Sequence, residues 1–430
     1  MVIGAGAAGL SAAHHICRDT KSIIVIDHSK HCGGFHKDRR IGPYSFDLGS
    51  IFYEVNSRLL DLAPGLRDLC LPVQRVQKRI EQSNRIAKYP FETREIRSWP
   101  VKHQLATLRD AFVTRHLSKP NGALDTLCVN RLGSTLFRET GLQDYVKRLN
   151  HLDPGEMDET FFYRRMGQID RATRGSVWSK LRQARKLGRK LPAAKPKMLV
   201  RPPEGFSAIF EKIQMHLERN GVTFRLGEAI HAISRENGVF LVDTDAGQIK
   251  AKSVISSAPV ETIYRLLFGR PTDLESLDLT TLFVSAERLD DRLGNVFYNF
   301  TRHGAWKRGT VYSKFYPDLG EGRSFFSVER TSLVHETVEP EDAFAEFAAQ
   351  LQKLGLANDL KLEGSAFTRN CYPLYRTGFL DRVNQITRDI EEAGITLVGR
   401  QGRFEYLPTS SLVIKQVIST LSQTANPVSR

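Results

Sequence analysis

The two ends of the chain share one pattern, an apolar strand followed by a glycine-containing turn and a helix. At the N-terminus, Met1–Ile3 predicts a strand, Leu10–Cys17 a helix, and the β-branched run Ser22–Ile26 a second strand. At the other end, Ile395–Val398 predicts a strand and Ser411–Leu421 a final helix. Strands that alternate with helices are typical of α/β domains, so we expect both ends to belong to one Rossmann-like domain.

The middle of the chain separates into a helical part and a strand-rich part. Residues 58–200 favour helix, with turn signals at Pro90, Pro100 and Pro154. After a helix over 204–219, strands are expected at 223–226, 239–244 and 248–257, an antiparallel sheet over 283–328, and an amphipathic helix over 339–354. We therefore expect helical and antiparallel-sheet insertions between the two ends.

Glycines mark the first turn. Gly4, Gly6 and Gly9 form a Gly-x-Gly-x-x-Gly motif between the predicted strand and helix, and Asp27 ends the next strand. In a dinucleotide site the first glycine permits a tight turn, the second admits a diphosphate to the backbone, and the third lets the helix pack on the strand. The helix N-terminus attracts the diphosphate, and the Asp27 carboxylate accepts hydrogen bonds from ribose hydroxyls. An acid at this position disfavours the 2′-phosphate of NADP.

Composition and charge indicate a folded protein with one basic segment. The 430 residues are 41% hydrophobic and 26% charged, and the formal net charge is +14. Residues 164–201 contain thirteen Lys or Arg and a single acid, Asp170, and so carry +12. The other 392 residues, with 49 basic and 47 acidic side chains, carry only +2. The charge therefore belongs to one segment of a nearly neutral protein.

The basic segment has an apolar stripe at helical spacing, made by Val177, Trp178, Leu181, Ala184, Leu187, Gly188 and Leu191. A basic amphipathic helix with a tryptophan is typical of an element that lies on an anionic membrane surface. An ordinary helix packed on the substrate domain explains the pattern equally well. Nucleic acid is not an expected partner, because no nucleic-acid-binding module accompanies the charge.

Cysteine usage and hydropathy bear on localisation. The cysteines are scattered without a Cys-x-x-Cys pair, and we interpret them as free thiols in a reducing cytoplasm: Cys17, Cys32, Cys70, Cys128 and Cys371. No run of about 18 apolar residues occurs, and the N-terminus lacks the basic leader of a secretory signal. We expect a cytoplasmic protein, peripheral on the inner face of the membrane if the basic segment binds lipid. No metal site is expected.

Further motifs make the dinucleotide site resemble a known family. They are Gly33-Gly34, Asp47-x-Gly49, Pro203-Glu204-Gly205-Phe206, the strand Glu228–Ile233, Ser257-Ala258-Pro259 and Val398-Gly399-Arg400. Together they resemble the FAD-binding group that includes amine oxidases, protoporphyrinogen oxidases, phytoene desaturases and UDP-galactopyranose mutases. The resemblance implies FAD, although another dinucleotide stays open on the first motif alone.

The resemblance also implies roles for individual residues. Gly33 and Gly34 would form the turn that passes the flavin, and Asp47 and Gly49 the loop near the isoalloxazine. The backbone at Ile230 would hold the adenine. The C-terminal motif, with Gly399, Arg400 and Leu407, would return to the diphosphate and the flavin.

The fold class that follows is α/β: a Rossmann-like FAD-binding domain of the glutathione-reductase type with an inserted helical and antiparallel-sheet substrate domain. The expected boundaries are 1–57, 203–268 and 386–430 for the FAD-binding domain, 58–202 for a mostly helical substrate region, and 269–385 for the antiparallel-sheet region.

Several segments are most similar to the mutase-like branch: Lys88-Tyr89-Pro90-Phe91, Tyr145-x-Lys147-x-Leu149, Cys371-Tyr372-Pro373 and the stretch from Gly399 to Tyr406. In this branch, tyrosines and arginines at matching positions hold a substrate diphosphate. By position, Tyr372 and Tyr406 would donate hydroxyl hydrogen bonds and Arg165 would supply a planar charged fork. The alternative is that the tyrosines are core residues and Arg165 a solvated surface charge.

The sequence also departs from the mutases. Their Gly-x-His loop beside the flavin corresponds here to Gly49-Ser50-Ile51, which has no histidine, and their acidic C-terminal motif corresponds to Leu407-Pro408-Thr409-Ser410. Our first hypothesis is therefore an FAD-dependent oxidoreductase that moves hydride from a small, diphosphate-linked or lipid-linked substrate to flavin N5. A non-redox mutase acting on a nucleotide sugar, as in polysaccharide biosynthesis, and a membrane-docked flavoprotein scaffold are the alternatives. No catalytic base is marked by its spacing.

Overall fold

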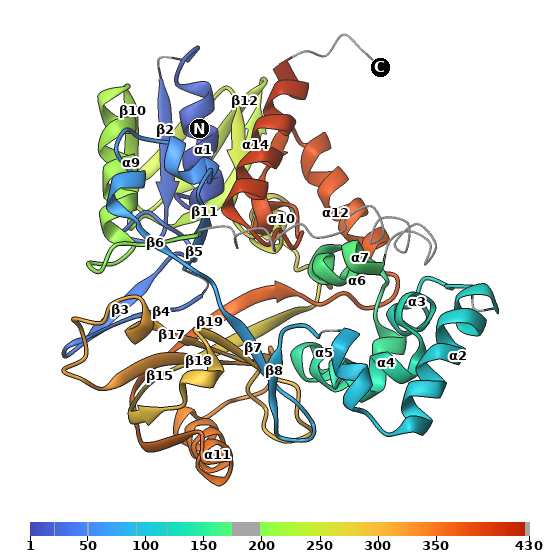
Figure 1. Ribbon diagram of the computed structural model, residues 1–430. Coiled ribbons are helices and arrows are strands. Elements are labelled where there is room, and N and C mark those ends of the chain that lie inside the picture. Colours follow the sequence, from blue (N-terminus) through green and yellow to red (C-terminus); the bar gives the residue numbers. More distant parts are fainter. Residues whose placement is uncertain (21, 50, 92, 118, 174–197, 426–430) are drawn as a thin grey trace, which may run out of the picture.

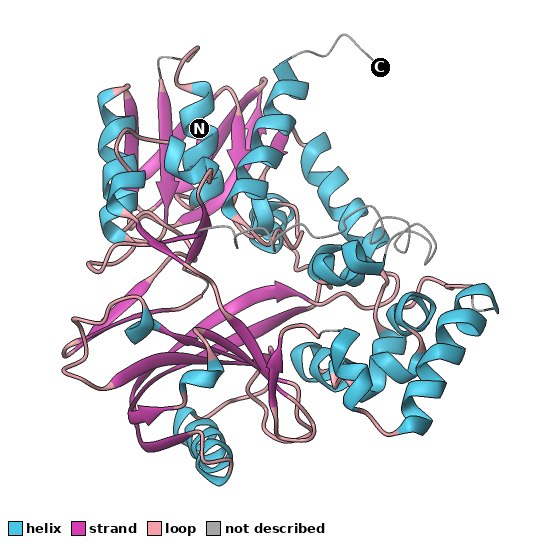
Figure 2. Ribbon diagram, viewed as in Figure 1, coloured by secondary structure: helices cyan, strands magenta, loops and turns pink. Residues whose placement is uncertain are grey.

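The computed structural model describes residues 1–430 except 21, 50, 92, 118, 174–197 and 426–430. Figure 1 shows three parts: a Rossmann-like domain at the top, a large twisted sheet below it, and a lobe of helices at the side. Figure 2 shows that strands dominate the lower part and helices dominate the lobe. The apolar stripe expected between 177 and 191 lies outside the described residues.

A five-stranded parallel sheet forms the core of the Rossmann-like domain, in the order β10–β2–β1–β14–β20. Val2 in β1 pairs with Val25 on one side and Ile255 on the other, and all three are buried. A parallel sheet covered on both faces needs such apolar strands. The strands are β1 (Val2–Ile3), β2 (Ile23–Asp27), β10 (Val222–Leu226), β14 (Val254–Ser256) and β20 (Ile395–Leu397). The prediction that both chain ends belong to one domain is confirmed.

Helices from the beginning, middle and end of the chain cover this sheet. The first turns of α1 consist of small residues, which are buried and allow close approach to the strands. The helices are α1 (Ala7–Ile16), α9 (Ser207–Arg219), α10 (Val260–Phe268), α12 (Phe379–Glu392) and α14 (Ser410–Ala425). The antiparallel strands β11 (Ile230–Glu236), β12 (Val239–Thr244) and β13 (Gly247–Ala251) complete the domain. Helix α12 runs across residue 385, where we expected a domain boundary.

A seven-stranded sheet forms the lower part, in the order β19–β15–β18–β17–β16–β7–β8. Its neighbours are antiparallel except for β16 and β7. The strands are β7 (Gln77–Ile80), β8 (Ile86–Lys88), β15 (Ser276–Leu289), β16 (Val296–Asn299), β17 (Arg308–Val311), β18 (Ser324–Leu333) and β19 (Ala357–Pro373). Helix α11 (Pro340–Lys353) packs on β15 and β19. The antiparallel sheet predicted over 283–328 is confirmed and extends beyond that range.

The lobe at the side contains helices between residues 101 and 173. They are α2 (Val101–Leu117), α3 (Leu124–Leu132), α4 (Ser134–Glu139), α5 (Leu142–Asn150), α6 (Thr160–Arg165) and α7 (Gly167–Thr173). The expectation of helix is wrong for residues 58–98, which form short 3-10 helices and the strands β6 (Leu71–Val73), β7 and β8. These strands are three or four residues long, and pairing with distant strands, not local pattern, decides their state. Among the described residues, no helix is long and apolar enough to cross a membrane.

Two small sheets lie between the upper and lower parts. They are β3 (Asp38–Ile41) with β4 (Tyr44–Asp47), and β5 (Phe52–Glu54) with β9 (Met198–Val200) and β6. A fully buried ion pair joins them, because Arg201 Nε donates to Asp47 Oδ1 at 2.8 Å. Arg201 belongs to the basic segment of the sequence. That segment is therefore not uniformly a surface feature.

Candidate functional site

Gly4 and Gly9 are required by the first turn itself. Gly4 has a φ of +101°, and a Cβ there would lie 2.4 Å from the Ser257 hydroxyl. A Cβ on Gly9 would lie 1.8 Å from the Gly4 carbonyl oxygen. Side-chain atoms do not approach other groups so closely, so these two glycines let α1 begin directly against β1 and the turn after β14.

Gly6 differs from them because the protein itself tolerates a side chain at this position. Its φ and ψ, −80° and 179°, are open to any residue. A Cβ there would meet only Gly34, at an ordinary 3.6 Å. The Gly33 N–H donates to the Ala5 carbonyl at 2.9 Å, which holds the two glycine turns together. The fold therefore does not itself require a glycine at position 6, and the missing side chain leaves the backbone there open to a ligand.

Asp27 lies beside this turn with spare capacity for hydrogen bonds. Its Oδ2 accepts the Ala5 N–H at 2.7 Å, and its Oδ1 accepts the Ser29 N–H at 2.8 Å. An ionised carboxylate offers about four acceptor positions. The His28 Nδ1 also lies 3.3 Å from Oδ1, so at least one position remains for a ribose hydroxyl.

The start of α1 completes an anion site. Gly6 provides no side-chain cap, and the first turn of the helix contains no acidic residue. The free N–H groups and the dipole of such a helix end attract a phosphate. The cradle at Gly6, the uncapped helix and the Asp27 carboxylate together fit a dinucleotide such as FAD.

The C-terminal motif meets the same end of α1. Gly399 has a φ of +77°, and a Cβ there would lie 2.4 Å from the Ala8 Cβ. The short helix α13 (Gly399–Gly402) therefore packs on α1, and its Arg400 side chain donates to the Cys371 carbonyl. Of the other expected cofactor residues, Ile230 begins β11 half-buried and Leu407 is buried between α13 and α14.

The Asp47 side chain joins its loop to a second small sheet. It is fully buried and pairs with Arg201, and burial raises its pKa to about 6 although Arg201 opposes the shift. This ion pair holds the two small sheets together. Gly49, two residues later, is half-buried with open space beside it, as a loop near a cofactor requires.

The three residues proposed for substrate binding lie together although they are distant in sequence. The Arg165 guanidinium lies over the rings of Tyr406 and Tyr372, 4.1 and 4.5 Å from their centroids. Arg400 lies over the same rings at 5.0 and 5.1 Å. All four side chains are half-buried, so part of each stays accessible. Arg165 forms no ion pair with a carboxylate of the described residues.

Below these rings lies a buried charged group that the sequence did not indicate. The pairing of β17 with β18 places Arg308 opposite Glu329, and the two form an ion pair. The Lys307 ammonium lies 2.8 Å from the same carboxylate and donates to the Tyr372 hydroxyl at 3.0 Å. Lys307 and Glu329 are 3% and 1% exposed. Because the Tyr372 oxygen accepts from lysine, its own hydrogen is free to point to a ligand.

The cations control ionisation in this cluster. Burial opposes the ionisation of Glu329, but Arg308 and Lys307 outweigh it and lower its pKa to about 2. Burial also opposes the ionisation of Tyr406, yet Arg165 and the neighbouring cations lower its pKa below the ordinary value. A phenol with a lowered pKa is a strong hydrogen-bond donor.

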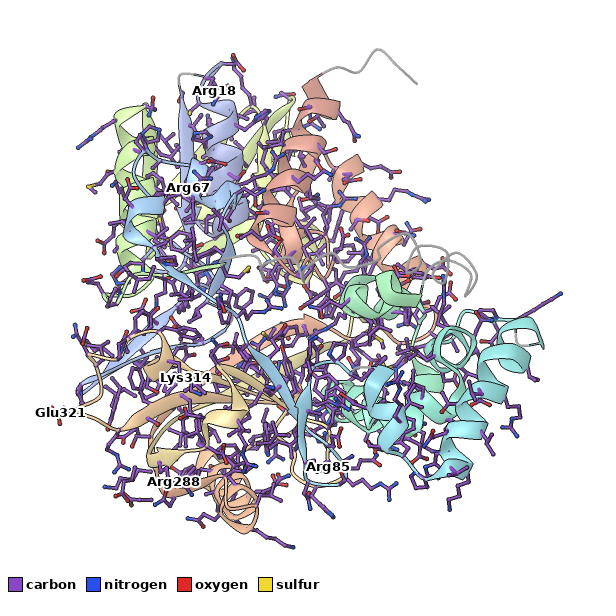
Figure 3. All side chains as sticks on the ribbon, in the orientation of Figure 1. Arg18, Arg67, Arg85, Arg288, Lys314 and Glu321 are labelled. Atoms are coloured by element: carbon purple, nitrogen blue, oxygen red, sulfur yellow. The ribbon has the colours of Figure 1, made fainter. Side chains whose placement is uncertain are left out.

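Aromatic rings line the neighbouring side. Tyr89 stacks on Tyr298 with 3.9 Å between centroids, and Tyr145 meets Tyr298 edge-on at 6.1 Å. Figure 3 shows side chains filling the region between the upper and lower parts of the molecule. The cluster thus combines four cations, Arg165, Lys307, Arg308 and Arg400, with one acid and a group of tyrosines. Its chemistry suits an anion with several oxygens.

Comparison with known proteins extends this picture to the fold. A family model described as an NAD(P)-binding Rossmann-like domain matches residues 2–63. No curated protein matches the chain in sequence. A crystal structure of reduced UDP-galactopyranose mutase superposes with a TM-score of 0.80 at 15% identity, over 100% of this chain and 96% of that one.

Two further structures show the same likeness. A protein named "Putative protoporphyrinogen oxidase", from Exiguobacterium sp. 255-15, gives a TM-score of 0.73 at 17% identity over 98% and 97% of the two chains. A fatty acid isomerase from P. acnes that produces CLA gives 0.63 at 12% identity over 99% and 97%. The chain therefore has the fold of these proteins, a Rossmann-like nucleotide-binding domain with inserted sheet and helical parts, which is the fold that its motifs resemble.

Proposed function

We propose that the protein is a flavoenzyme that holds FAD at the start of α1 and acts on a small substrate with a diphosphate. The observation that carries this proposal is Arg165, stacked on Tyr372 and Tyr406 with no carboxylate of the described residues to neutralise it. Bound FAD would supply the reactive centre at its isoalloxazine. The residues of this chain would bind, orient and stabilise the substrate.

The cluster suits a diphosphate in two ways. The Arg165 guanidinium can donate two parallel hydrogen bonds to one phosphate group. Its contacts with the rings of Tyr372 and Tyr406 already restrict its conformation, so it loses little conformational entropy when it binds the anion. The hydroxyls of Tyr372 and Tyr406 add donors, and Lys307 fixes the direction of the first of them. Two half-buried tyrosines and an arginine can thus each direct hydrogens to the incoming anion.

A reaction that releases the diphosphate gains most from this arrangement. When a sugar carbon separates from a phosphate oxygen, negative charge develops on that oxygen, and fixed donors stabilise it in the transition state. A mutase-like, non-redox reaction on a nucleotide sugar is therefore the function that the cluster supports best. The fold shared with a UDP-galactopyranose mutase supports the same proposal.

An oxidoreductase is the second candidate, and one observation favours it. The loop Gly49-Ser50-Ile51 has no histidine where the mutases carry one beside the flavin. Hydride transfer needs only a substrate carbon held against the cofactor. The same cluster would then anchor the substrate without taking part in bond cleavage.

Spectroscopy and product analysis test these proposals in order. The purified protein is expected to show the visible bands of oxidised flavin, and a colourless, cofactor-free protein would overturn the proposal. Anaerobic reduction with dithionite, followed by UDP-sugars and chromatography of the products, is expected to give an isomerised sugar. Consumption of an electron acceptor in proportion to product, with no isomer, would replace the mutase by the oxidoreductase.

A further inference from the structure

Helix α2 exposes three large aliphatic side chains along one line. Val101, Leu105 and Leu108 are 70%, 61% and 59% exposed. Spacings of four and three residues place them on one face of the helix. Single exposed aliphatics are common on protein surfaces, but a contiguous group marks an interaction site. We call these three residues the α2 stripe.

The opposite face of α2 packs against the other helices of the lobe. Asp110 is 3% exposed and accepts hydrogen bonds from the Thr135 N–H at 2.8 Å and the Ser134 hydroxyl at 2.9 Å. These contacts fix the helix to α4, and α2 also packs on α3. Figure 1 shows α2 at the outer edge of the lobe, facing away from the Rossmann-like domain. The lobe is therefore built without the α2 stripe.

The surroundings of the stripe are basic. Lys102 and Arg109 lie seven residues apart on one flank, and both are exposed. Arg109 touches the buried Asp110 at 3.2 Å but keeps 69% of its side chain exposed. None of the exposed residues between positions 97 and 109 is acidic; they are Arg97, Ser98, Pro100, Val101, Lys102, Leu105, Leu108 and Arg109. Trp99, half-buried, lies two residues before the start of the helix.

We propose that α2 docks the protein on an anionic lipid surface. The α2 stripe would enter the boundary between headgroups and acyl chains, and Lys102 and Arg109 would meet the lipid phosphates. A second copy of the chain fits this face poorly, because self-association would bring like cations together, and none of the exposed residues described between 97 and 109 is a carboxylate that could pair with them. These residues lie outside the basic segment 164–201 in the sequence, and the proposal does not depend on the proposed reaction.

Vesicle binding of the full-length protein tests the proposal. The protein is expected to sediment with vesicles of phosphatidylcholine and phosphatidylglycerol and to stay in solution with phosphatidylcholine alone. In the double variant Leu105→Ser with Leu108→Ser, binding to the anionic vesicles is expected to fall about tenfold or more. Lys102→Glu with Arg109→Glu should abolish the preference for phosphatidylglycerol. Val334→Ser, at a 57% exposed aliphatic residue after β18, is the matched control and should bind as the unmodified protein does.

Each other outcome overturns the proposal. Binding that survives the Leu105→Ser, Leu108→Ser change would assign the membrane contact to another part of the chain. If the protein binds neither kind of vesicle, the proposed membrane contact does not exist. If the same variant instead converts a lipid-free dimer to a monomer in analytical ultracentrifugation, the stripe serves a second copy. Circular dichroism and flavin content, unchanged in all variants, establish that the fold is retained.

Discussion

Gly6 and Gly9 are expected to respond in opposite ways to the same substitution. Both are glycines of one motif, and each receives one methyl group on mutation to alanine. At Gly9 the new Cβ would lie 1.8 Å from the Gly4 carbonyl oxygen, so α1 must move away from the strand. At Gly6 the new Cβ would make an ordinary contact at 3.6 Å but would stand where a diphosphate approaches the helix.

The magnitudes follow from these two environments. Forcing an extra methyl into a packed site costs about 1–3 kcal/mol, and the better helix propensity of alanine over glycine offsets roughly 1 kcal/mol of this. Because the added methyl at Gly9 meets backbone atoms, the upper part of this range applies, about 2–3 kcal/mol. Gly9→Ala should therefore lose about 1–2 kcal/mol of unfolding free energy, or a few degrees in Tm. Gly6→Ala should leave the stability of the cofactor-free protein almost unchanged. It should lower the FAD affinity at least tenfold, about 1.4 kcal/mol.

The FAD content and the Tm must be measured on the same preparations of each variant. The ratio of flavin to protein absorbance reports bound FAD, and thermal melts must compare cofactor-free proteins because bound ligand itself stabilises the fold. Full FAD content in Gly6→Ala would refute the reasoning. So would a loss of Tm in that variant as large as the loss in Gly9→Ala.

Three further predictions concern the charged cluster. Arg165→Ala should weaken UDP binding about 10- to 150-fold, since a hydrogen bond to a charged group is worth roughly 1.5–3 kcal/mol. Arg165→Lys should recover only part of this affinity. Equal UDP affinities of the unmodified protein and Arg165→Ala in calorimetric titration would contradict this prediction. Lys307→Met should weaken UDP binding in the otherwise unmodified protein, because Lys307 orients the Tyr372 hydroxyl. In a Tyr372→Phe background the same change should cause little further loss of affinity. Fully additive losses in a double-mutant cycle would argue against the orienting role. Glu329 has a folded pKa of about 2, below its ordinary value, so its contribution to stability is present above about pH 4.5 and is lost as the pH falls toward 2. Glu329→Gln should flatten the unfolding free energy across that acid range and lower it at neutral pH, and a wild-type-like acid profile in urea melts would exclude the effect.

Local features of the fold were predictable from the sequence, whereas features fixed by distant pairing were not. The strand at Met1–Ile3, the turn at Gly4 and the helix after it depend on neighbouring residues, and their pattern is visible in a short window. Strand β7 pairs with β16, more than 200 positions later, and β8 pairs with β7 at the edge of the same sheet. Neither strand carries a period of its own.

The same division applies to the candidate site. Arg165, Tyr372 and Tyr406 were found through motifs that resemble those of known mutases. Glu329 and Lys307 carry no motif, and only the register of β17 against β18 brings them under Tyr372. The ion pair of Asp47 was also not predictable, because its partner Arg201 lies in a segment whose charge indicated a surface.

The close approach of Gly399 to Ala8 would couple the proposed binding of FAD to the proposed binding of substrate. The backbone that bears Arg400 and leads to Tyr406 rests on the first turn of α1, the turn that would hold the FAD diphosphate. A cofactor that orders this turn therefore also orders part of the substrate site. Linkage requires the effect to be reciprocal, so the factor by which FAD raises the affinity for substrate is the factor by which substrate raises the affinity for FAD. The protein would then bind FAD most tightly when substrate is bound.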